Sequence, residues 1–193
     1  MTPPFRLLGV ADTSLDLGQS PVPELMISLA RHYGAEPLVL EPDTPGPVPR
    51  HHFFPDLEIK RLYTGIPPAT RAGRIAYILA AVREIHLFRP DLLVVFGTFA
   101  LPVLFRLHDR PPFVIYYLTG PVLSFGQNEV RMNRAARPWL DLLLFPEEDQ
   151  AVQDVERCLF QEIPLVILLP CVHPPEERNW DSQFAKVKLY LKD

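Results

Sequence analysis

The stretch RPDLLVVFGT, residues 89–98, decides the fold. Residues 92–96 form a continuous apolar run that is short for a helix and is bounded by Pro90 and Gly97. Such a run is typical of a strand buried on both faces of a parallel sheet, because helices cover both sides and no polar alternation remains. Gly97 directly follows this strand, so we expect it at the carboxyl edge of the sheet, where open α/β sheets bind ligands.

The segment before this strand, residues 70–88, has the clearest helical pattern of the chain. Its apolar side chains recur at helical spacing and predict one buried stripe: Ile75, Ile78, Leu79, Val82 and Ile85. A helix of this length that leads directly into a buried strand is half of a β-α-β crossover. The stretch 70–98 therefore predicts a parallel sheet with a helix packed on one face.

Other apolar runs extend the same alternation along the chain. Strands are predicted over residues 5–11, 37–40, 57–63, 113–118, 140–145 and 165–169. One helix is predicted to end at residue 33, a second to span 98–107 and a third to begin near 146. Residues 126–137 are a polar, arginine-bearing connection that could hold a short helix. The weak pattern over 57–63 predicts a sheet edge. Alternating strands and helices with short links imply a doubly wound, mainly parallel Rossmann-like sheet in three α/β/α layers.

Two units are predicted along the chain. Residues 1–175 are assigned to the Rossmann-like domain and residues 176–193 to a C-terminal tail. In the tail an apolar stripe predicts a helix that packs back on the domain: Trp180, Phe184, Val187 and Leu191. The same segment also alternates apolar residues with lysines, as an exposed strand would, and the helix is preferred because its stripe is longer.

Composition limits the function classes. The chain has 193 residues, of which 48% are hydrophobic and 22% charged, which is ordinary for a globular protein. Its net charge of −4 argues against binding nucleic acid, which normally needs a basic face. Two cysteines make no disulfide framework and fit a reducing cytoplasm. No apolar run reaches the roughly 18 residues of a membrane span.

Five short strings carry a resemblance to a known family. They are RPD at 89–91, FGT at 96–98, VIYYL at 114–118, LDLLLFP at 140–146 and ILLPCV at 167–172. In this order they resemble the N-terminal, acceptor-side domain of GT-B glycosyltransferases of the family 4 type, over residues 5–175. The resemblance implies sugar transfer from a nucleotide sugar to a hydroxyl of a sugar or lipid-linked acceptor. No bound cofactor is predicted. Acceptor domains of this family often sit against membranes, so the resemblance also implies contact with a membrane surface.

The chain departs from the family pattern in three respects. Thr119 stands where the family often has histidine, and Cys171 and Val172 stand where it has Asn-Gly. The family's second domain, which binds the nucleotide sugar, has no counterpart in these 193 residues. We therefore expect a domain that keeps the family's last helix in its tail, lacks the donor half, and depends on a partner subunit or a second copy for it.

The loop after the first strand contains Gly18, Gln19 and Ser20. Its backbone N–H groups could hold an acceptor sugar or an anion at the following helix N-terminus. It is not the spaced triple-glycine dinucleotide fingerprint, and no lysine makes it a phosphate loop. A plain turn and helix cap is the alternative interpretation.

Two strand ends are predicted at the ligand-binding edge of the sheet. Gly97 and Thr98 follow one central strand, and Thr119 and Gly120 follow the next. Because parallel strands end at the same edge, these four residues are candidates for binding the acceptor hydroxyl. Simple strand termination is the alternative.

The densest basic patch consists of Arg131, Arg134 and Arg137, spaced to share one helix face. These arginines could hold a phosphate, a pyrophosphoryl lipid head group or a membrane surface. A solvated helix face is the alternative. His173 lies where a linker between domains would face the cleft, although a single histidine is weak evidence.

No catalytic residue can be named from the sequence, and no histidine, cysteine or acid cluster has the spacing of a metal site. Three functions remain open. The first is the acceptor half of a sugar transferase in the cytoplasm, with or without contact to a membrane surface. The second is a non-catalytic binding or scaffold protein that kept the fold, and the third is a flavodoxin-like domain that binds a ligand. Fold alone does not decide among them.

Overall fold

The computed structural model describes residues 4–13, 22–43, 56–119, 125–145, 159–167 and 185–191. In this part of the chain seven strands pair side by side in the order β3-β2-β1-β4-β5-β6-β7. Every pairing is parallel. The strands are β1 (Arg6–Ala11), β2 (Glu36–Pro42), β3 (Glu58–Leu62), β4 (Leu92–Phe96), β5 (Phe113–Tyr117), β6 (Leu142–Phe145) and β7 (Leu165–Ile167). The predicted parallel sheet is confirmed, with β3 at one edge.

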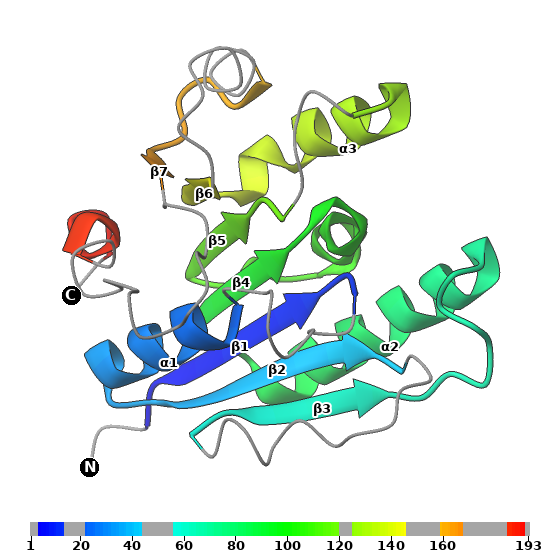
Figure 1. Cartoon of the computed structure of the whole chain (residues 1–193), viewed down its shortest axis with the longest axis horizontal. Coiled ribbons are helices and arrows are strands. Elements are labelled where there is room, and N and C mark those ends of the chain that lie inside the picture. The colour runs from blue at the N-terminus through cyan, green and yellow to red at the C-terminus, as the bar shows by residue number, and fades with distance from the viewer. Residues whose placement is uncertain are drawn as a thin grey trace, which may run out of the picture.

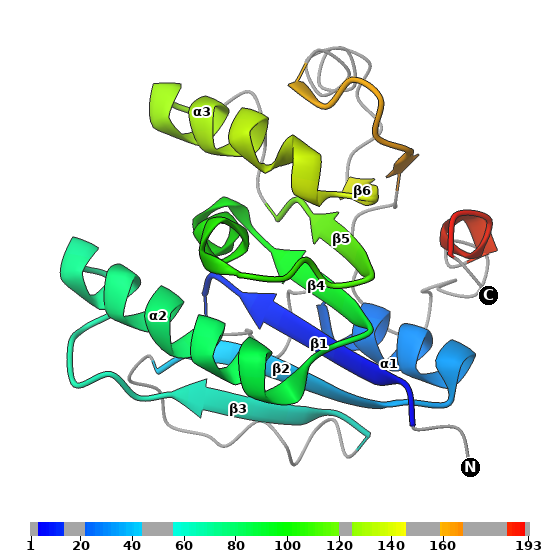
Figure 2. The same cartoon turned by 180° about the vertical axis from the view of Figure 1, so that it is seen from behind.

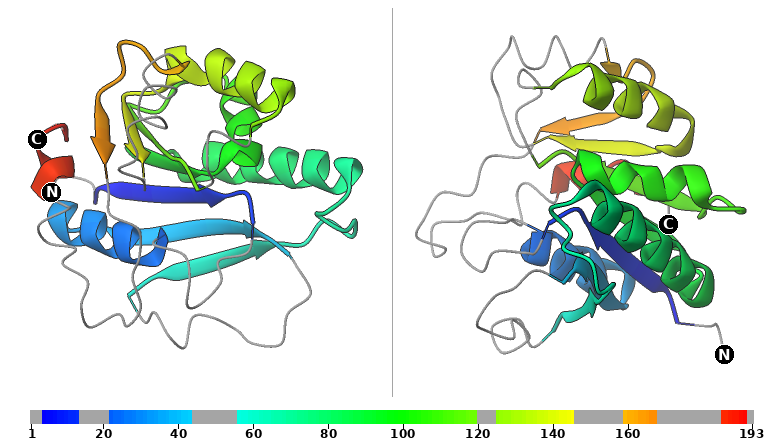
Figure 3. Two further views of the ribbon diagram at one scale, coloured as in Figure 1. Left: turned by 45° about the horizontal axis from the view of Figure 1, so that its top comes forward. Right: turned by 90° about the vertical axis from the view of Figure 1, so that its right-hand side faces the viewer.

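Helices cover both faces of this sheet. They are α1 (Val22–Tyr33), α2 (Arg71–Phe88), the 3₁₀ helix η2 (Thr98–Arg106), α3 (Gln127–Ala136) and the short 3₁₀ helix η4 (Arg137–Trp139). Helix α1 lies on the face seen in Figure 1, and α2 and α3 lie on the face seen in Figure 2. Figure 3 shows the strands between α1 and α2. The predicted three-layer architecture is therefore confirmed.

The core consists of two apolar clusters, one on each face. Along β4, Leu93 and Val95 point into the cluster beneath α2, η2 and α3, whereas the alternate residues point into the cluster beneath α1. All five residues of β4 are buried. This double burial explains why the strand reads as a continuous apolar run.

Helix α2 begins where the sequence predicts and buries Ile78, Val82 and Ile85 of the predicted stripe, but its buried face is shifted. Thr70 is the N-cap, and its hydroxyl accepts a hydrogen bond from the N–H of Gly73 at 3.0 Å. The predicted stripe is wrong at Ile75 and Leu79, which are 47% and 50% exposed. The helix instead turns Tyr77 and Ala81 inward. Tyr77 anchors this orientation because its hydroxyl reaches the ends of two strands.

The segment after β4 is a 3₁₀ helix rather than an α-helix. Pro102 lies inside it and has no N–H to donate. Its N-cap is Gly97, at φ 83° and ψ 156°. This combination of angles is essentially restricted to glycine. The glycine therefore fixes the direction in which the chain leaves the central strand.

The described part of the tail packs on the α1 side of the sheet. Residues 185–188 form a helical turn, and Val187 is fully buried in the cluster beneath α1. Leu191 packs against the same cluster, whereas Leu189 is 82% exposed. The boundary between a domain over 1–175 and a tail over 176–193 stays a prediction.

Candidate functional site

Strand order places the candidate site between β1 and β4. The chain runs outward from β1 to β2 and β3 on one side, and from β4 to β5, β6 and β7 on the other. Ala11 pairs with Phe96 at the last position of the two strands, so Asp12 and Gly97 leave the sheet side by side. The crevice at such a reversal of strand order is where open α/β sheets bind ligands.

Asp12 and Gly97 are in close contact. A Cβ atom on Gly97 would lie 1.9 Å from Oδ2 of Asp12, so only glycine leaves room for the carboxylate. The same Oδ2 accepts a hydrogen bond from the N–H of Phe99 at 3.2 Å, and the N–H of Asp12 donates to the carbonyl of Phe96 at 3.1 Å. Asp12 thus supplies the cap that glycine cannot give to the N-terminus of η2.

The Asp12 carboxyl has a raised pKa in this position. Burial raises its pKa from 3.8 to about 6, and this effect outweighs the hydrogen bond from Phe99, which lowers the pKa. A carboxyl group with a pKa near the working pH can accept and return a proton. Asp12 therefore has the protonation behaviour of a general acid or base.

The Tyr77 hydroxyl lies beneath the site. It donates to the carbonyl of Ala11 at 2.5 Å and lies 3.1 Å from the carbonyl of Leu40. Burial raises the pKa of Tyr77 well above its ordinary value, and the charges of Asp12 and Glu41 raise it further. The tyrosine stays neutral and ties α2 to the ends of β1 and β2.

Glu41 is a second buried acid at this edge of the sheet. It is 0% exposed, and its Oε1 lies 2.6 Å from Nε of Arg61 on the neighbouring strand. The two residues are register partners in the β2–β3 pairing. Because the Arg61 guanidinium neutralises Glu41, this pair is structural. Asp12 instead accepts hydrogen bonds from Phe99 and Thr13.

Phe99 and Arg74 lie in contact near the N-terminus of η2. The ring of Phe99 is 41% exposed, and the guanidinium carbon of Arg74 lies 4.8 Å from its centroid. This is a cation–π distance. The contact places an exposed aromatic face and a positive charge beside the N-terminus of η2, a suitable surface for a polar ligand with an apolar face.

The predicted acceptor residues fall in different environments. Gly97 is buried against Asp12, and Thr98 is 8% exposed with its hydroxyl 3.0 Å from that of Tyr116. Thr119 is exposed. Acceptor binding by these residues stays a prediction. The other candidates lie outside the described residues: Gly18, Gln19, Ser20, Gly120 and His173.

The three arginines of the basic patch divide into two groups. Arg131 and Arg134 are exposed on α3. Arg137 begins η4, is partly buried, and its Nε donates to the carbonyl of Leu159. Only the first two are thus displayed on one helix, and contact with phosphate or membrane stays a prediction.

Sequence reasoning missed Asp12, Tyr77, Glu41 and Arg61. The available signal was an acid directly after the first strand, since the first strand of a doubly wound sheet commonly lies beside the strand that reverses the order. Among the described residues, no group of three or more His, Cys, Asp or Glu side chains is placed to hold a metal ion. In the same residues, no helix has the length and apolar character needed to cross a bilayer.

Comparison with known proteins gives matches in structure alone. No family model matches the chain, and no curated protein matches it. Its structure is similar to sucrose-phosphate synthase from Thermosynechococcus elongatus, with a TM-score of 0.64 and 14% identity over 97% of this chain and 53% of that one. MurG of Acinetobacter baumannii gives a TM-score of 0.53 and 13% identity, over 91% and 48% of the two chains.

A second structure of the synthase matches from end to end. It has a TM-score of 0.62 and 11% identity, and the match covers 95% of this chain and 96% of that one. The chain thus spans about half of the first synthase structure and of MurG, and nearly all of this second one. It has a glycosyltransferase-like fold that corresponds to one domain of GT-B enzymes, as the sequence predicts.

Proposed function

We propose that this chain is the acceptor-binding half of a sugar-transferring enzyme, completed by a donor half from a partner subunit or a second copy. Two observations support the proposal. The fold is that of one GT-B domain, and a carboxyl group whose pKa is raised by burial lies at the strand-order reversal. The carboxyl group supplies the proposed catalytic step.

Asp12 is the proposed general base. A hydroxyl of the acceptor approaches the Asp12 carboxylate, and its oxygen attacks the anomeric carbon of a nucleotide sugar held by the donor half. The Asp12 carboxylate takes the hydroxyl proton while the nucleoside diphosphate leaves with its bonding electron pair. A pKa of about 6 leaves the carboxylate ionised at neutral pH and basic enough to assist.

The acceptor class follows from the surface near the site. Phe99 offers an aromatic face to a sugar ring, and Arg131 and Arg134 on α3 offer two exposed guanidinium groups to a phosphate. We propose that the acceptor is a sugar or is lipid-linked. We also propose that this protein is cytoplasmic and contacts membranes at their surface. The net charge of −4 disfavours nucleic acid as a partner.

One observation favours a non-catalytic alternative. Oδ2 of Asp12 already accepts the N–H of Phe99 and fills the space beside Gly97, so the carboxylate has a structural role without any substrate. A binding or scaffold protein that retained the fold would need no more than this.

Calorimetry against uridine and guanosine diphosphate sugars, with release of nucleoside diphosphate followed in parallel, tests the proposal. We expect no turnover by the isolated chain, and turnover when a fraction containing the donor half is added. Asp12→Asn should abolish that turnover, because asparagine can keep the bond to Phe99 but cannot take a proton. Asp56→Asn, at an exposed acid that precedes β3 and pairs with the exposed Arg31, is the matched control and should leave it unchanged.

Three results would contradict the proposal. Turnover by the isolated chain would show that no partner is needed. Turnover that survives Asp12→Asn would exclude Asp12 as the general base. Absence of turnover with every fraction tested would favour the scaffold alternative.

A further inference from the structure

A pocket of about 490 Å³ opens at the amino edge of the sheet. It lies between the end of α2, the starts of β1 and β4, and the link that leads into β5. Charged, histidine and proline side chains predominate in its wall: Arg6, Ile85, His86, Arg89, Pro90, Asp91, Asp109, Arg110, Pro111 and Pro112. Its volume is in the range of small-molecule sites.

This pocket is separate from the candidate site at Asp12. Arg6 is the first residue of β1, and Asp91 directly precedes β4. Asp12 and Gly97 follow the last residues of the same two strands. The two places are therefore at opposite edges of one parallel sheet, and the sugar-transfer proposal makes no use of the pocket.

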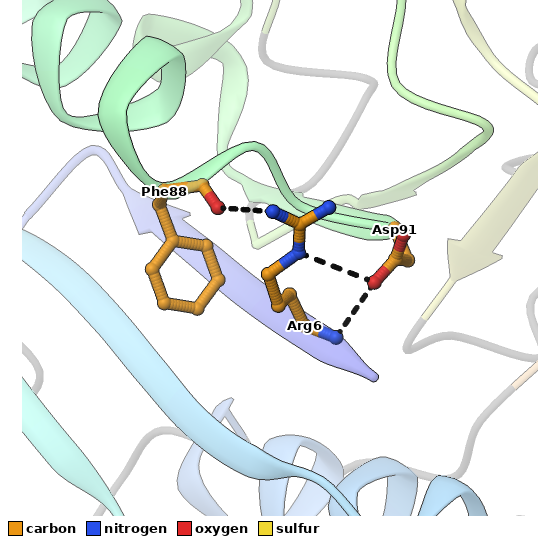
Figure 4. A network of polar contacts seen from close by, with 3 residues as sticks. All are labelled: Arg6, Phe88 and Asp91. Carbon is orange, nitrogen blue, oxygen red and sulfur yellow. Dashed lines mark hydrogen bonds and ion pairs between the residues drawn. The ribbon is translucent and has the colours of Figure 1, made fainter. Parts of the chain in front are cut away.

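Arg6 forms one wall and is held in place by three contacts (Figure 4). Its Nε lies 3.5 Å from Oδ2 of Asp91, its Nη1 donates to the carbonyl of Phe88 at 3.3 Å, and its main-chain N–H donates to the same Oδ2 at 2.8 Å. The guanidinium is thus oriented by contacts through Nε and Nη1. A guanidinium has five N–H donors in all.

Arg110 is oriented in the same way. Its Nη2 lies 2.7 Å from Oδ2 of Asp141, and this carboxylate also accepts the main-chain N–H of Val114 at 2.8 Å. This ion pair involves one of the two terminal nitrogens, and the guanidinium has five N–H donors in all. Two of the three arginines in the wall are therefore fixed by carboxylates rather than free to move.

Arg89 is the third arginine, and its backbone is unusual. It caps the C-terminus of α2 in the left-handed region, at φ 52° and ψ 66°, where glycine is the usual residue. None of the ion pairs found among the described residues involves its side chain. An arginine in a strained position that lines a pocket without an acidic partner is a candidate ligand-binding residue.

The rest of the wall suits an organic molecule rather than a bare ion. Pro90, Pro111 and Pro112 give rigid apolar surface, and His86 stacks on His108 with centroids 5.4 Å apart. The Asp109 carboxylate can accept hydrogen bonds from hydroxyl or amino groups. The pocket combines three guanidinium groups for an oxyanion with flat and hydrogen-bonding surface for the group that carries it.

We propose that this pocket binds a phosphate monoester of about mononucleotide size, with the phosphate on Arg89, Arg6 and Arg110. Guanidinium groups bind phosphate oxygens in pairs, and their bonds are charge-assisted. Asp109 and the proline surface hold the organic part. The site is independent of the sugar-transfer reaction.

Titration calorimetry of the 193-residue chain with adenosine 5′-monophosphate tests the proposal, at constant ionic strength. Adenosine and inorganic phosphate are the other two arms of the experiment. We expect adenosine 5′-monophosphate to bind more tightly than either. Arg89→Gln should weaken its binding at least about tenfold, as expected for loss of a charge-assisted contact. Arg83→Gln, an exposed arginine of α2 outside the pocket, is the matched control and should bind as the parent chain does.

Arg89→Gly separates binding from folding. Glycine is favoured in the left-handed region, so this variant should unfold no more easily than the parent chain and should still lose binding. Absence of binding at about 10 mM ligand would overturn the proposal. Equal affinity of the Arg89 and Arg83 variants would overturn it too, as would equal affinity for inorganic phosphate and the monoester.

Discussion

Replacing Gly97 by alanine tests the contact on which the candidate site depends. The new Cβ would lie 1.9 Å from Oδ2 and 2.4 Å from Oδ1 of Asp12, so the carboxylate must move away. Its hydrogen bond to Phe99 would then be lost, at a cost of about 1.5–3 kcal/mol for a charged acceptor. The backbone at φ 83° and ψ 156° adds about 1–3 kcal/mol for a residue with a side chain.

We therefore expect Gly97→Ala to lower the free energy of unfolding by about 3–5 kcal/mol, a large part of the stability of an ordinary domain. Urea unfolding followed by circular dichroism measures it. Gly34→Ala is the matched control, because Gly34 also has a positive φ, 62°, but a Cβ there would meet nothing within 4 Å. Backbone strain alone should cost about 1–2 kcal/mol at that position.

The difference between the two variants isolates the contact with Asp12. In an Asp12→Ala background the cost of Gly97→Ala should fall, since the two changes remove one shared contact. The reasoning is refuted if Gly97→Ala and Gly34→Ala differ by less than about 1 kcal/mol, or if the two costs at Gly97 and Asp12 simply add.

Three further predictions concern the buried polar groups of the same edge. Tyr77→Phe should destabilise the chain by about 1–3 kcal/mol, because the buried carbonyl of Ala11 loses the hydroxyl that donates to it; an unchanged urea midpoint would contradict this. Arg61→Met should cost about 3 kcal/mol or more, because the buried Glu41 carboxylate loses the guanidinium that balances its charge. Lys60→Met on the same strand removes a more exposed pair and should cost under about 1 kcal/mol; similar costs would refute the distinction. Asp12 binds a proton more readily in the folded than in the unfolded chain, so its contribution to stability falls as pH rises from about 4 to about 6. Asp12→Asn should remove this part of the dependence of the unfolding free energy on pH, measured by urea unfolding across that range. An unchanged dependence would argue against the raised pKa.

Most of the fold could be predicted from the sequence because its strands are short apolar runs separated by glycine and proline. The run over β4 matches the observed strand residue for residue, and the weak pattern over β3 marks an edge strand. The prediction failed where tertiary contacts decide. Periodicity could not show that α2 would turn Tyr77 inward and leave Ile75 and Leu79 exposed. The orientation of the helix depends on the Tyr77 hydroxyl, which lies against main-chain carbonyls of two strands distant in sequence.

The candidate site was predictable only in part. Gly97 was identified because it ends a strand whose burial is visible in the sequence. Asp12 was not, since an acid after a strand looks like any turn residue until β1 and β4 are known to be neighbours. Glu41 and Arg61 were missed for the same reason, because their pairing depends on the register of β2 against β3.

The central position of β1 has a consequence for how this protein is made. The strand is flanked by β2 and β4, and Leu7, Leu8 and Val10 are fully buried between the two helical layers. During synthesis β2 follows it closely, but β4 ends 85 residues after β1, from Ala11 to Phe96. At about 5–20 residues per second the ribosome needs roughly 4 to 17 s to supply that neighbour. For this interval one edge of an apolar strand stays open to other nascent chains, and a chaperone that shields such strands would protect the first segment of the polypeptide.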